Sequence, residues 1–244
     1  MRTLSAIFAH PDDETFSSGG TLAKYAAADV RCTLFVATDG DAGRTSGLQV
    51  GSREELGHIR RSELHAAARV LGLQSVDTPG YPDGALGAVD QDELIGRIVA
   101  HFRRERPQVV ITFGPEGAPN AHGDHRAISR GATAAFFLAG NRGAFGDQLE
   151  GGLAPHAPAR LFYVSWPPPS PDAELTVLAV PATARIDVRD FMDVERDAWA
   201  AHVSQHALQQ RFDQLAATED ELFALAAGVP QPTPVISDLF AGLT

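Results

Sequence analysis

The 244-residue chain is predicted to adopt an α/β fold: one Rossmann-like domain with a mostly parallel sheet and helices on both of its faces. Three apolar runs, at residues 4–9, 31–38 and 108–113, have the length and composition of buried strands. Stretches with helical spacing separate them, and this alternation is typical of parallel sheets. Because 44% of the residues are hydrophobic, the chain can bury one sizeable core. We expect a single domain with a core at about residues 1–160, followed by C-terminal strands and helices at 161–244.

The first strand ends in a cluster of polar side chains. Pro11 lacks an amide hydrogen and disfavours helical geometry at the residue before it, so the strand should stop there and turn. The turn carries four side chains that can bind metals or protons: His10, Asp12, Asp13 and Glu14. Open α/β sheets bind ligands at this edge, where the strands end. Three carboxylates so close together repel one another unless a cation neutralises them, which indicates a divalent metal.

The segment after this turn carries no other recognisable site. No Gly-x-Gly-x-x-Gly follows the first strand, so a dinucleotide site has no support, and a helix is expected at residues 21–28. The acidic loop at residues 39–43 lacks the full calcium-loop pattern, and we interpret it as a surface turn. Cys32 is the single cysteine and lies in the second strand, so no disulfide framework exists.

Two helices are predicted between the second and third strands. The first is amphipathic and covers residues 53–71, and Gly72 ends it. The second covers residues 92–104 and ends before Pro107. The strand at residues 108–113 then follows, which continues the strand–helix alternation.

Beyond the third strand the pattern becomes less regular. A helix is predicted to start near Asp124, and the Gly-rich residues 140–158 are expected to form a loop or lid. Two more strands are predicted at residues 161–165 and 175–180, and a helix at residues 190–208.

A second polar cluster follows the third strand and a Gly/Pro-rich loop, and it contains His122, Asp124 and His125. If both strands belong to one parallel sheet, both clusters open on the same edge. The set His10, Asp13 and His125 would then supply two imidazoles and one carboxylate and leave a fourth position open for water, as in catalytic zinc sites. Taken alone, each cluster could be an exposed turn or a helix cap. Their shared position at two strand ends favours a metal site.

The two clusters resemble the motifs of the LmbE/PIG-L family of zinc-dependent N-deacetylases. Residues 9–14 read Ala-His-Pro-Asp-Asp-Glu, and residues 122–125 match the downstream His-x-Asp-His, with Gly123 where proline is common. Members of this family remove acetyl groups from N-acetylglucosamine conjugates, including precursors of mycothiol and bacillithiol. The resemblance covers most of the first two-thirds of the chain and weakens after about Ala159. It implies an LmbE-like single domain with its catalytic core at about residues 1–160.

The resemblance implies a hydrolase in which metal-activated water attacks an acetamide. It implies one Zn²⁺ per chain on His10, Asp13 and His125, although such sites also accept Fe²⁺ or other divalent metals. Asp12, adjacent to these ligands, would be the general base.

Three further residues are expected to support that chemistry. His122 would stabilise the oxyanion or protonate the leaving amine, and Asp124 would hold the His122 tautomer and raise its pKa. Glu14 would orient one of the metal ligands without binding the metal itself. Alternatively, it is an ordinary acidic residue at a helix N-terminus.

Three residues match positions that contact substrate in the family. They are Arg61 in the long helix, Asp83 in the Gly-Tyr-Pro-Asp-Gly loop and Gln205 in the segment His-Val-Ser-Gln. Each also has an ordinary interpretation, respectively an exposed helical arginine, a turn-forming aspartate before glycine, and a capping or packing glutamine. The implied partner is a small N-acetylated amino-sugar conjugate.

Composition limits the other partners. The formal charge of −11 argues against nucleic acid and against an anionic membrane. No signal peptide is visible and no apolar stretch approaches a membrane span, so we expect a cytoplasmic protein. The tail from residue 228 onward is Pro-rich and then apolar, which suggests docking on its own domain or on a second subunit of a homo-oligomer.

Other functions remain open on the same residues. A sugar-binding module could keep the metal without turning substrate over, although an unpaired base beside the metal argues for catalysis. The enzyme could also hydrolyse a different amide. A two-metal phosphoesterase should show more bridging carboxylates and more basic residues for phosphate.

Overall fold

The structure is a computed structural model and describes residues 1–167 and 178–243. Within these residues, seven strands form one sheet in the order β3-β2-β1-β4-β5-β7-β6. The first five strands of that order run parallel to one another, and β7 is antiparallel to both of its neighbours. The strands are β1 (Thr3–Phe8), β2 (Arg31–Val36), β3 (Ser75–Asp77), β4 (Val109–Thr112), β5 (Arg160–Ser165), β6 (Ala184–Asp187) and β7 (Asp220–Gly228).

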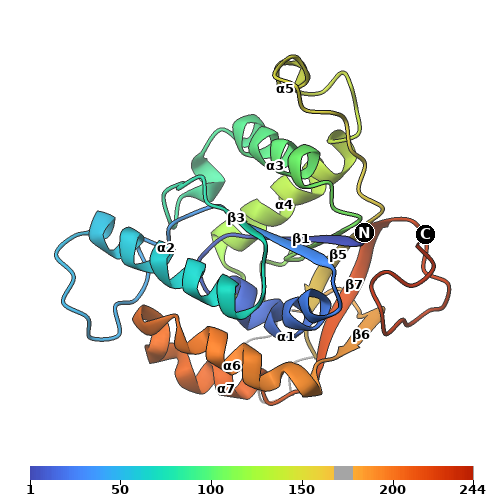
Figure 1. Cartoon of the computed structure of the whole chain (residues 1–244). Helices are drawn as coiled ribbons and strands as arrows, with labels where there is room; N and C mark the ends of the chain where they lie inside the picture. Colours follow the sequence, from blue (N-terminus) through green and yellow to red (C-terminus); the bar gives the residue numbers. More distant parts are fainter. Residues whose placement is uncertain (168–177, 244) are drawn as a thin grey trace.

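Helices cover both faces of this sheet (Figure 1). One face carries α3 (Gln91–Glu105) and α4 (Gly123–Leu138). The other carries α1 (Asp13–Ala27) and α2 (Arg53–Val70), and α6 (Met192–Ala200) packs against both of these helices from outside. The shorter helices are α5 (Gly146–Glu150), α7 (Gln209–Leu215) and the 3-10 turns η1 (Leu86–Ala88), η2 (Arg189–Phe191) and η3 (Val203–Leu208). Within the described ranges, no helix has both the length and the apolar character that a membrane span requires.

The core lies between the sheet and its two helical layers. Residues 4–8 of β1 and residues 32–36 of β2 are buried without interruption, as expected for strands covered on both faces. At the carboxyl end of β1, the rings of Phe8 and Phe113 lie 4.9 Å apart. The predicted α/β class with a mostly parallel sheet is therefore confirmed.

Several predicted elements have different boundaries. The helix expected at residues 21–28 begins at Asp13, and the backbone at Ser18 leaves helical geometry, so α1 is kinked. The helix expected at residues 190–208 is divided into η2, α6 and η3. Its break falls at His202, which has φ −84° and ψ 57° and a fully buried side chain.

The later strands were largely missed from the sequence. Of the strand predicted at residues 175–180, residues 175–177 lie outside the described residues and residues 178–180 form no strand, and β6 and β7 had no counterpart in the prediction. The short α5 lies within the predicted loop at residues 140–158. Arg103 holds this region, because its guanidinium donates to four backbone carbonyls between residues 139 and 145.

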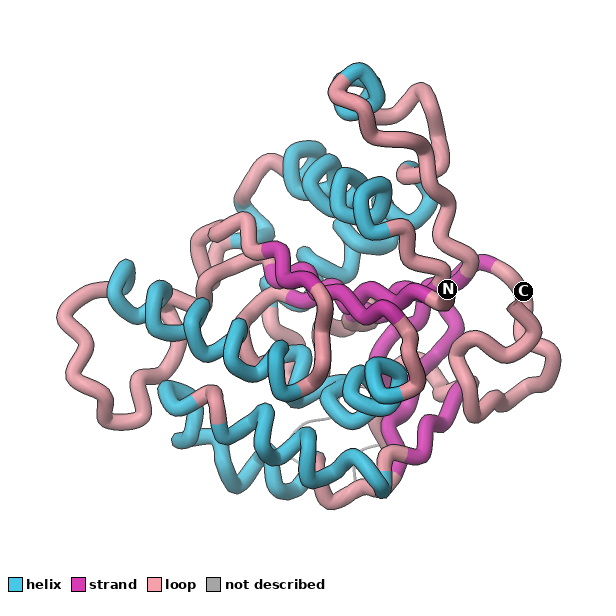
Figure 2. The backbone as a smooth tube through the Cα atoms, viewed as in Figure 1, coloured by secondary structure: helices cyan, strands magenta, loops and turns pink. Residues whose placement is uncertain are grey.

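The C-terminal tail docks on its own chain. Leu239 and Phe240 are buried, and the Phe240 ring packs against Tyr25 of α1 at 5.3 Å. Ile236 pairs with Ala184 at the edge of the sheet. Figure 2 shows the tail as a loop folded beside the last strands. Of the two alternatives for the tail, the structure shows docking on its own domain.

Candidate metal centre and active site

A cavity of about 540 Å³ opens at the carboxyl edge of the sheet. Its walls include residues that follow β1, β4 and β5, namely His10, Phe113 and Trp166. β1 pairs with β2 on one side and with β4 on the other, so the chain reverses its direction of winding between β1 and β4. Doubly wound sheets bind ligands at such a reversal. Both polar clusters therefore reach one cavity, as expected from the sequence.

Three side chains of the two clusters converge in this cavity. Nδ1 of His10 lies 3.2 Å from Nε2 of His125. The carboxylate of Asp13 lies 3.4 Å from the first nitrogen and 3.2 Å from the second. Two imidazole nitrogens and a carboxylate so close together fit a divalent cation that accepts lone pairs from all three. A ring nitrogen of His122 also lies within 4.8 Å of those of His10 and His125.

Local structure fixes Asp13 and His125 in this arrangement. One oxygen of Asp13 accepts the backbone N–H groups of His10 at 2.8 Å and Ala9 at 3.2 Å. The ring of His125 stacks on Phe113 with centroids 4.2 Å apart. Burial opposes ionisation of Asp13, but His125 and His10 outweigh it and hold the pKa of this carboxyl well below its usual range. Asp13 is thus an ionised ligand candidate.

Two carboxylates orient His10 from the side opposite Asp13. Nε2 of His10 lies 3.1 Å from Asp83 and 3.3 Å from Asp124. Asp124 is held in turn by the N–H groups of Gly84 at 2.7 Å and Leu86 at 3.0 Å. Carboxylates in this position keep the proton on Nε2 and leave the Nδ1 lone pair free to bind a metal.

This arrangement corrects the expected pairing of Asp124 with His122. The carboxylate of Asp124 faces His10, and only its backbone N–H contacts His122, by donating to Nδ1 at 3.2 Å. The ring proton of His122 therefore belongs on Nε2. Burial and the neighbouring His10 and His125 lower the pKa of His122, and the opposing effect of Asp124 is smaller. His122 is thus a neutral imidazole with an N–H to donate.

Asp12 adopts a strained backbone conformation beside the metal donors. Its φ of 111° lies in the left-handed region, which costs on the order of 1 kcal/mol or more for a residue with a side chain. The N–H of Asp12 donates to Oε2 of Glu14 at 3.0 Å, and its carboxylate lies 3.2 Å from Nη2 of Arg60. Burial raises the pKa of Asp12 to about 6, although the charge of Arg60 opposes the rise.

Arg60, rather than the expected Arg61, reaches the cavity from α2. The guanidinium of Arg60 is buried and also donates to the carbonyls of Gly40, at 2.8 Å, and of Pro11. Arg61 instead forms a two-point ion pair with Asp39 and does not line the cavity. The sequence contained a signal for this difference. Arg60 falls on the buried stripe of α2, which comprises Leu56, Arg60, Glu63, Leu64 and Ala67.

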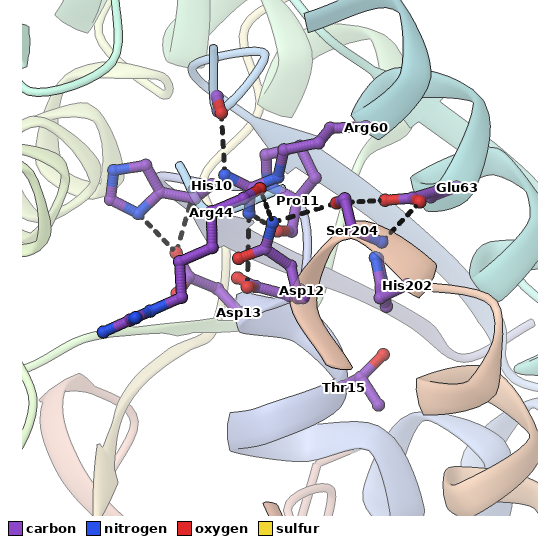
Figure 3. Close-up of polar contacts among 12 residues, drawn as sticks. His10, Pro11, Asp12, Asp13, Thr15, Arg44, Arg60, Glu63, His202 and Ser204 are labelled. Carbon is purple, nitrogen blue, oxygen red and sulfur yellow. Dashed lines mark hydrogen bonds and ion pairs between the residues drawn. The ribbon is translucent and has the colours of Figure 1, made fainter. Parts of the chain in front are cut away.

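Residues from the C-terminal third of the chain contact the polar cluster at the end of β1 and the helix α2. Nε2 of His202 lies 2.7 Å from Oε1 of Glu14, and both side chains are fully buried. Two residues further on, Ser204 donates its N–H and its hydroxyl to Glu63 of α2, at 2.8 and 2.6 Å (Figure 3). Glu14 thus contacts Asp12 and His202 rather than a metal-ligand candidate. His202 and Ser204 belong to the segment His-Val-Ser-Gln that resembles the family, in which only Gln205 was predicted to have a role.

The two remaining substrate candidates line the cavity. Asp83 uses one oxygen on His10 and accepts the N–H of Ala42 with the other, at 3.1 Å. Gln205 is buried, and its amide donates to the backbone carbonyl of Arg44 at 2.9 Å. Asp83 and Gln205 therefore border the cavity, and their contacts with a substrate remain predictions.

Comparison with known proteins gives consistent relatives. The family model "PIG-L: GlcNAc-PI de-N-acetylase" matches residues 5–136. A 1D-myo-inositol 2-acetamido-2-deoxy-α-D-glucopyranoside deacetylase of Catenulispora acidiphila is 30% identical over 99% of this chain and 97% of its own. A probable N-acetyl-α-D-glucosaminyl L-malate deacetylase of Bacillus cereus is 35% identical over 53% of this chain and 58% of its own. The crystal structure of a conserved protein from Thermus thermophilus superposes with a TM-score of 0.73 at 28% identity, covering 94% and 97% of the two chains.

Proposed function

Because the chain belongs to the PIG-L family of de-N-acetylases, we propose that it is a zinc-dependent hydrolase that removes the N-acetyl group of an N-acetylglucosamine conjugate. The observation that carries this proposal is the convergence of His10, Asp13 and His125 on one point, with the buried carboxylate of Asp12 beside them. The cavity of about 540 Å³ is within the size range of small-molecule sites, so it can take a sugar and part of its aglycone.

His10, Asp13 and His125 would hold the Zn²⁺ ion. When bound at such a site, zinc makes water a nucleophile at neutral pH and polarises a carbonyl group. Asp83 and Asp124 keep the proton of His10 on Nε2, so that Nδ1 can serve as a ligand. Phe113 fixes the plane of the His125 ring by stacking.

Asp12 takes the proton of the attacking water. Its raised pKa, about 6, suits a group that must accept a proton and then give it up near neutral pH. The charge of Arg60 keeps a fraction of Asp12 ionised despite its burial. Asp12 can then deliver the proton to the leaving amine, because His122, the residue first expected in that role, has a lowered pKa.

His122 stabilises the carbonyl oxygen as it gains negative charge. Its Nε2 carries the ring proton, because Nδ1 accepts the Asp124 N–H at 3.2 Å. A neutral donor placed in this way resembles an oxyanion hole, whose removal typically costs roughly a hundredfold to a thousandfold in kcat. Of the two roles considered for His122, stabilisation of the oxyanion is therefore the better supported.

The test is release of free amine from a panel of N-acetylglucosamine conjugates by purified, zinc-loaded protein. The inositol and malate conjugates named for the relatives belong in that panel. We expect amine release that a chelator abolishes and that added zinc restores. Binding of these conjugates without amine release, in both zinc-loaded and iron-loaded protein, would instead favour a sugar-binding module.

A further inference from the structure

Two arginines of the cavity wall have no hydrogen-bond or ion-pair partner among the described residues. Arg44 lies in the loop between β2 and α2, and Arg211 lies in α7. Within residues 1–167 and 178–243, neither guanidinium makes a hydrogen bond or an ion pair. The third arginine of the cavity, Arg60, is already occupied by Asp12 and two backbone carbonyls. Two of the three guanidiniums of the wall are therefore without a partner among the described residues.

The carboxylates of the same wall, in contrast, all have partners. Asp220 pairs with Arg185 of β6 at 3.0 Å. Glu221 accepts the N–H groups that follow the kink in α1, those of Gly20 at 2.8 Å and Thr21 at 3.0 Å. The remaining carboxylates contact His10, His125 or Arg60, and they are Asp12, Asp13 and Asp83. Arg44 and Arg211 are thus the charged side chains of the wall that have no partner among residues 1–167 and 178–243, although the whole chain carries −11.

Hydrogen bonds hold the segments that carry both arginines against each other. The carbonyl of Arg44 accepts the side-chain amide of Gln205 at 2.9 Å. Ser46 donates to the carbonyl of Ser204 at 2.6 Å and accepts the N–H of Ala207 at 2.8 Å. These contacts fix the loop to η3, and α7 begins where η3 ends. The backbone segments that carry Arg44 and Arg211 therefore adjoin each other and are held in place by these hydrogen bonds.

Apolar side chains also line the cavity, including Phe16, Leu208 and Leu222. Charged hydrogen bonds are stronger beside apolar groups than in open water, because the local dielectric constant is lower. Two guanidiniums without acceptors indicate a ligand that brings acceptor oxygens.

We propose that the aglycone of the substrate carries an anionic group, a carboxylate or a phosphate, that binds Arg44 and Arg211. This inference rests on the proposed function and names the class of conjugate. Arginine recognises carboxylate and phosphate oxygens through paired N–H groups. The relatives are named for a neutral polyol conjugate and for a malate conjugate, and the two arginines without partners match the acidic one.

The test compares three N-acetylglucosaminides with aglycones of similar size: 2-hydroxyethyl, carboxymethyl and 2-phosphoethyl. Values of kcat/KM are measured with zinc-loaded wild type, Arg44→Gln, Arg211→Gln and the double variant. We expect the wild type to prefer an anionic glycoside by roughly tenfold over the neutral one, as a partly exposed charge-assisted contact should give. The comparison of carboxymethyl with phosphoethyl identifies the anion.

The matched control is Arg142→Gln, because Arg142 is exposed like Arg44 and has no hydrogen-bond or ion-pair partner among the described residues, but does not line the cavity. The anionic preference should disappear in the double variant, remain in the control and weaken with added salt. Equal kcat/KM values for all three glycosides in the wild type, or a preference that survives in the double variant, would overturn the proposal.

A second measurement separates this inference from the proposed function. If no glycoside releases amine, the proposed function fails. Calorimetric binding of the same three glycosides to the same zinc-loaded proteins then tests the anion subsite alone. Tighter binding of an anionic glycoside that is lost in the double variant would support it, and binding independent of the aglycone charge would refute it.

Discussion

Replacement of His202 by alanine should slow turnover without releasing the metal, because this residue supports Asp12 through Glu14. His202 contacts one oxygen of Glu14 at 2.7 Å, and the other oxygen accepts the backbone N–H of Asp12 at 3.0 Å. Asp12 has a strained φ of 111°, so its position depends on such contacts. None of the three metal-ligand candidates contacts His202. His202 is thus a positioning residue for the proposed base.

The magnitude follows from the burial of the pair. Burial disfavours the charged form of His202, but Glu14 and Asp12 outweigh this effect and raise its pKa. Loss of one partner of a buried ion pair typically costs about 3–5 kcal/mol of folding free energy. A base displaced by even about 1 Å can cost roughly a hundredfold in rate. We therefore expect His202→Ala to lower kcat by roughly tenfold to a hundredfold.

The assay measures kcat, KM and zinc content together. His202→Gln keeps a donor for Glu14 and should recover part of kcat. Ser204→Ala is the matched control, because Ser204 is buried two residues away and bonds Glu63 instead. It should lower stability with little change in kcat. Loss of zinc from His202→Ala, or a normal kcat in a less stable protein, would refute this account of Asp12.

The stability of the same variants has a defined pH dependence. Because the folded-state pKa of His202 is raised, its contribution is fully present below its unfolded pKa and is lost as pH rises through the folded value. The loss of unfolding free energy in His202→Ala relative to wild type should thus be larger at about pH 6 than at high pH. Urea denaturation at both pH values measures this difference.

Four further predictions concern other groups. His125→Ala should lose the tightly bound metal by elemental analysis, since one of three protein donors is gone, and full metal content would contradict the site. Asp12→Asn should keep the metal and lose roughly a hundredfold to ten-thousandfold in kcat, and metal loss would mean that Asp12 is a ligand. His122→Ala should lower kcat while the basic limb of the pH–rate profile stays in place, and a shifted limb would restore His122 as the acid. Burial, with Glu221 nearby, raises the pKa of Glu195 to about 9, so wild type should lose stability as pH rises toward that value. The free energy of unfolding of Glu195→Gln, relative to that of wild type, should therefore increase by roughly 3 kcal/mol between about pH 5.5 and 7.5, at about 1.4 kcal/mol per pH unit. Urea denaturation measures this difference, and a difference that does not change with pH would refute the raised pKa of Glu195.

The sequence alone predicted which segments of the chain form the candidate metal centre. Two apolar runs, each followed by His and Asp, predicted two strand ends with metal-binding side chains. Parallel strands present their carboxyl ends on the same edge of a sheet, so the two clusters had to open on one side. The structure adds that β1 and β4 are direct neighbours, paired from Leu4 with Val109 to Ile7 with Thr112. His10 and His125 consequently lie 3.2 Å apart.

The roles of Arg60 and Arg61 could have been separated from the sequence. Both lie in α2, whose boundaries the amphipathic pattern predicted closely. The buried stripe of that helix includes Arg60, and Arg61 points toward Asp39 in the acidic loop. The resemblance to the family motif predicted that Arg61 reaches the site, whereas Arg60 lines the cavity. A helix turns about 100° per residue, so adjacent side chains face different surroundings.

Only the tertiary structure decided the partners of Asp124 and Glu14. Asp124 is two residues from His122 in sequence, yet its carboxylate faces His10, because it accepts the N–H groups of Gly84, before η1, and of Leu86, at the start of η1. Glu14 and His202 are 188 residues apart and meet because α6 packs on α1 and α2. Helical and strand periodicity reports which side of an element is buried. It does not report which distant group lies opposite, because that depends on how separate elements pack against one another.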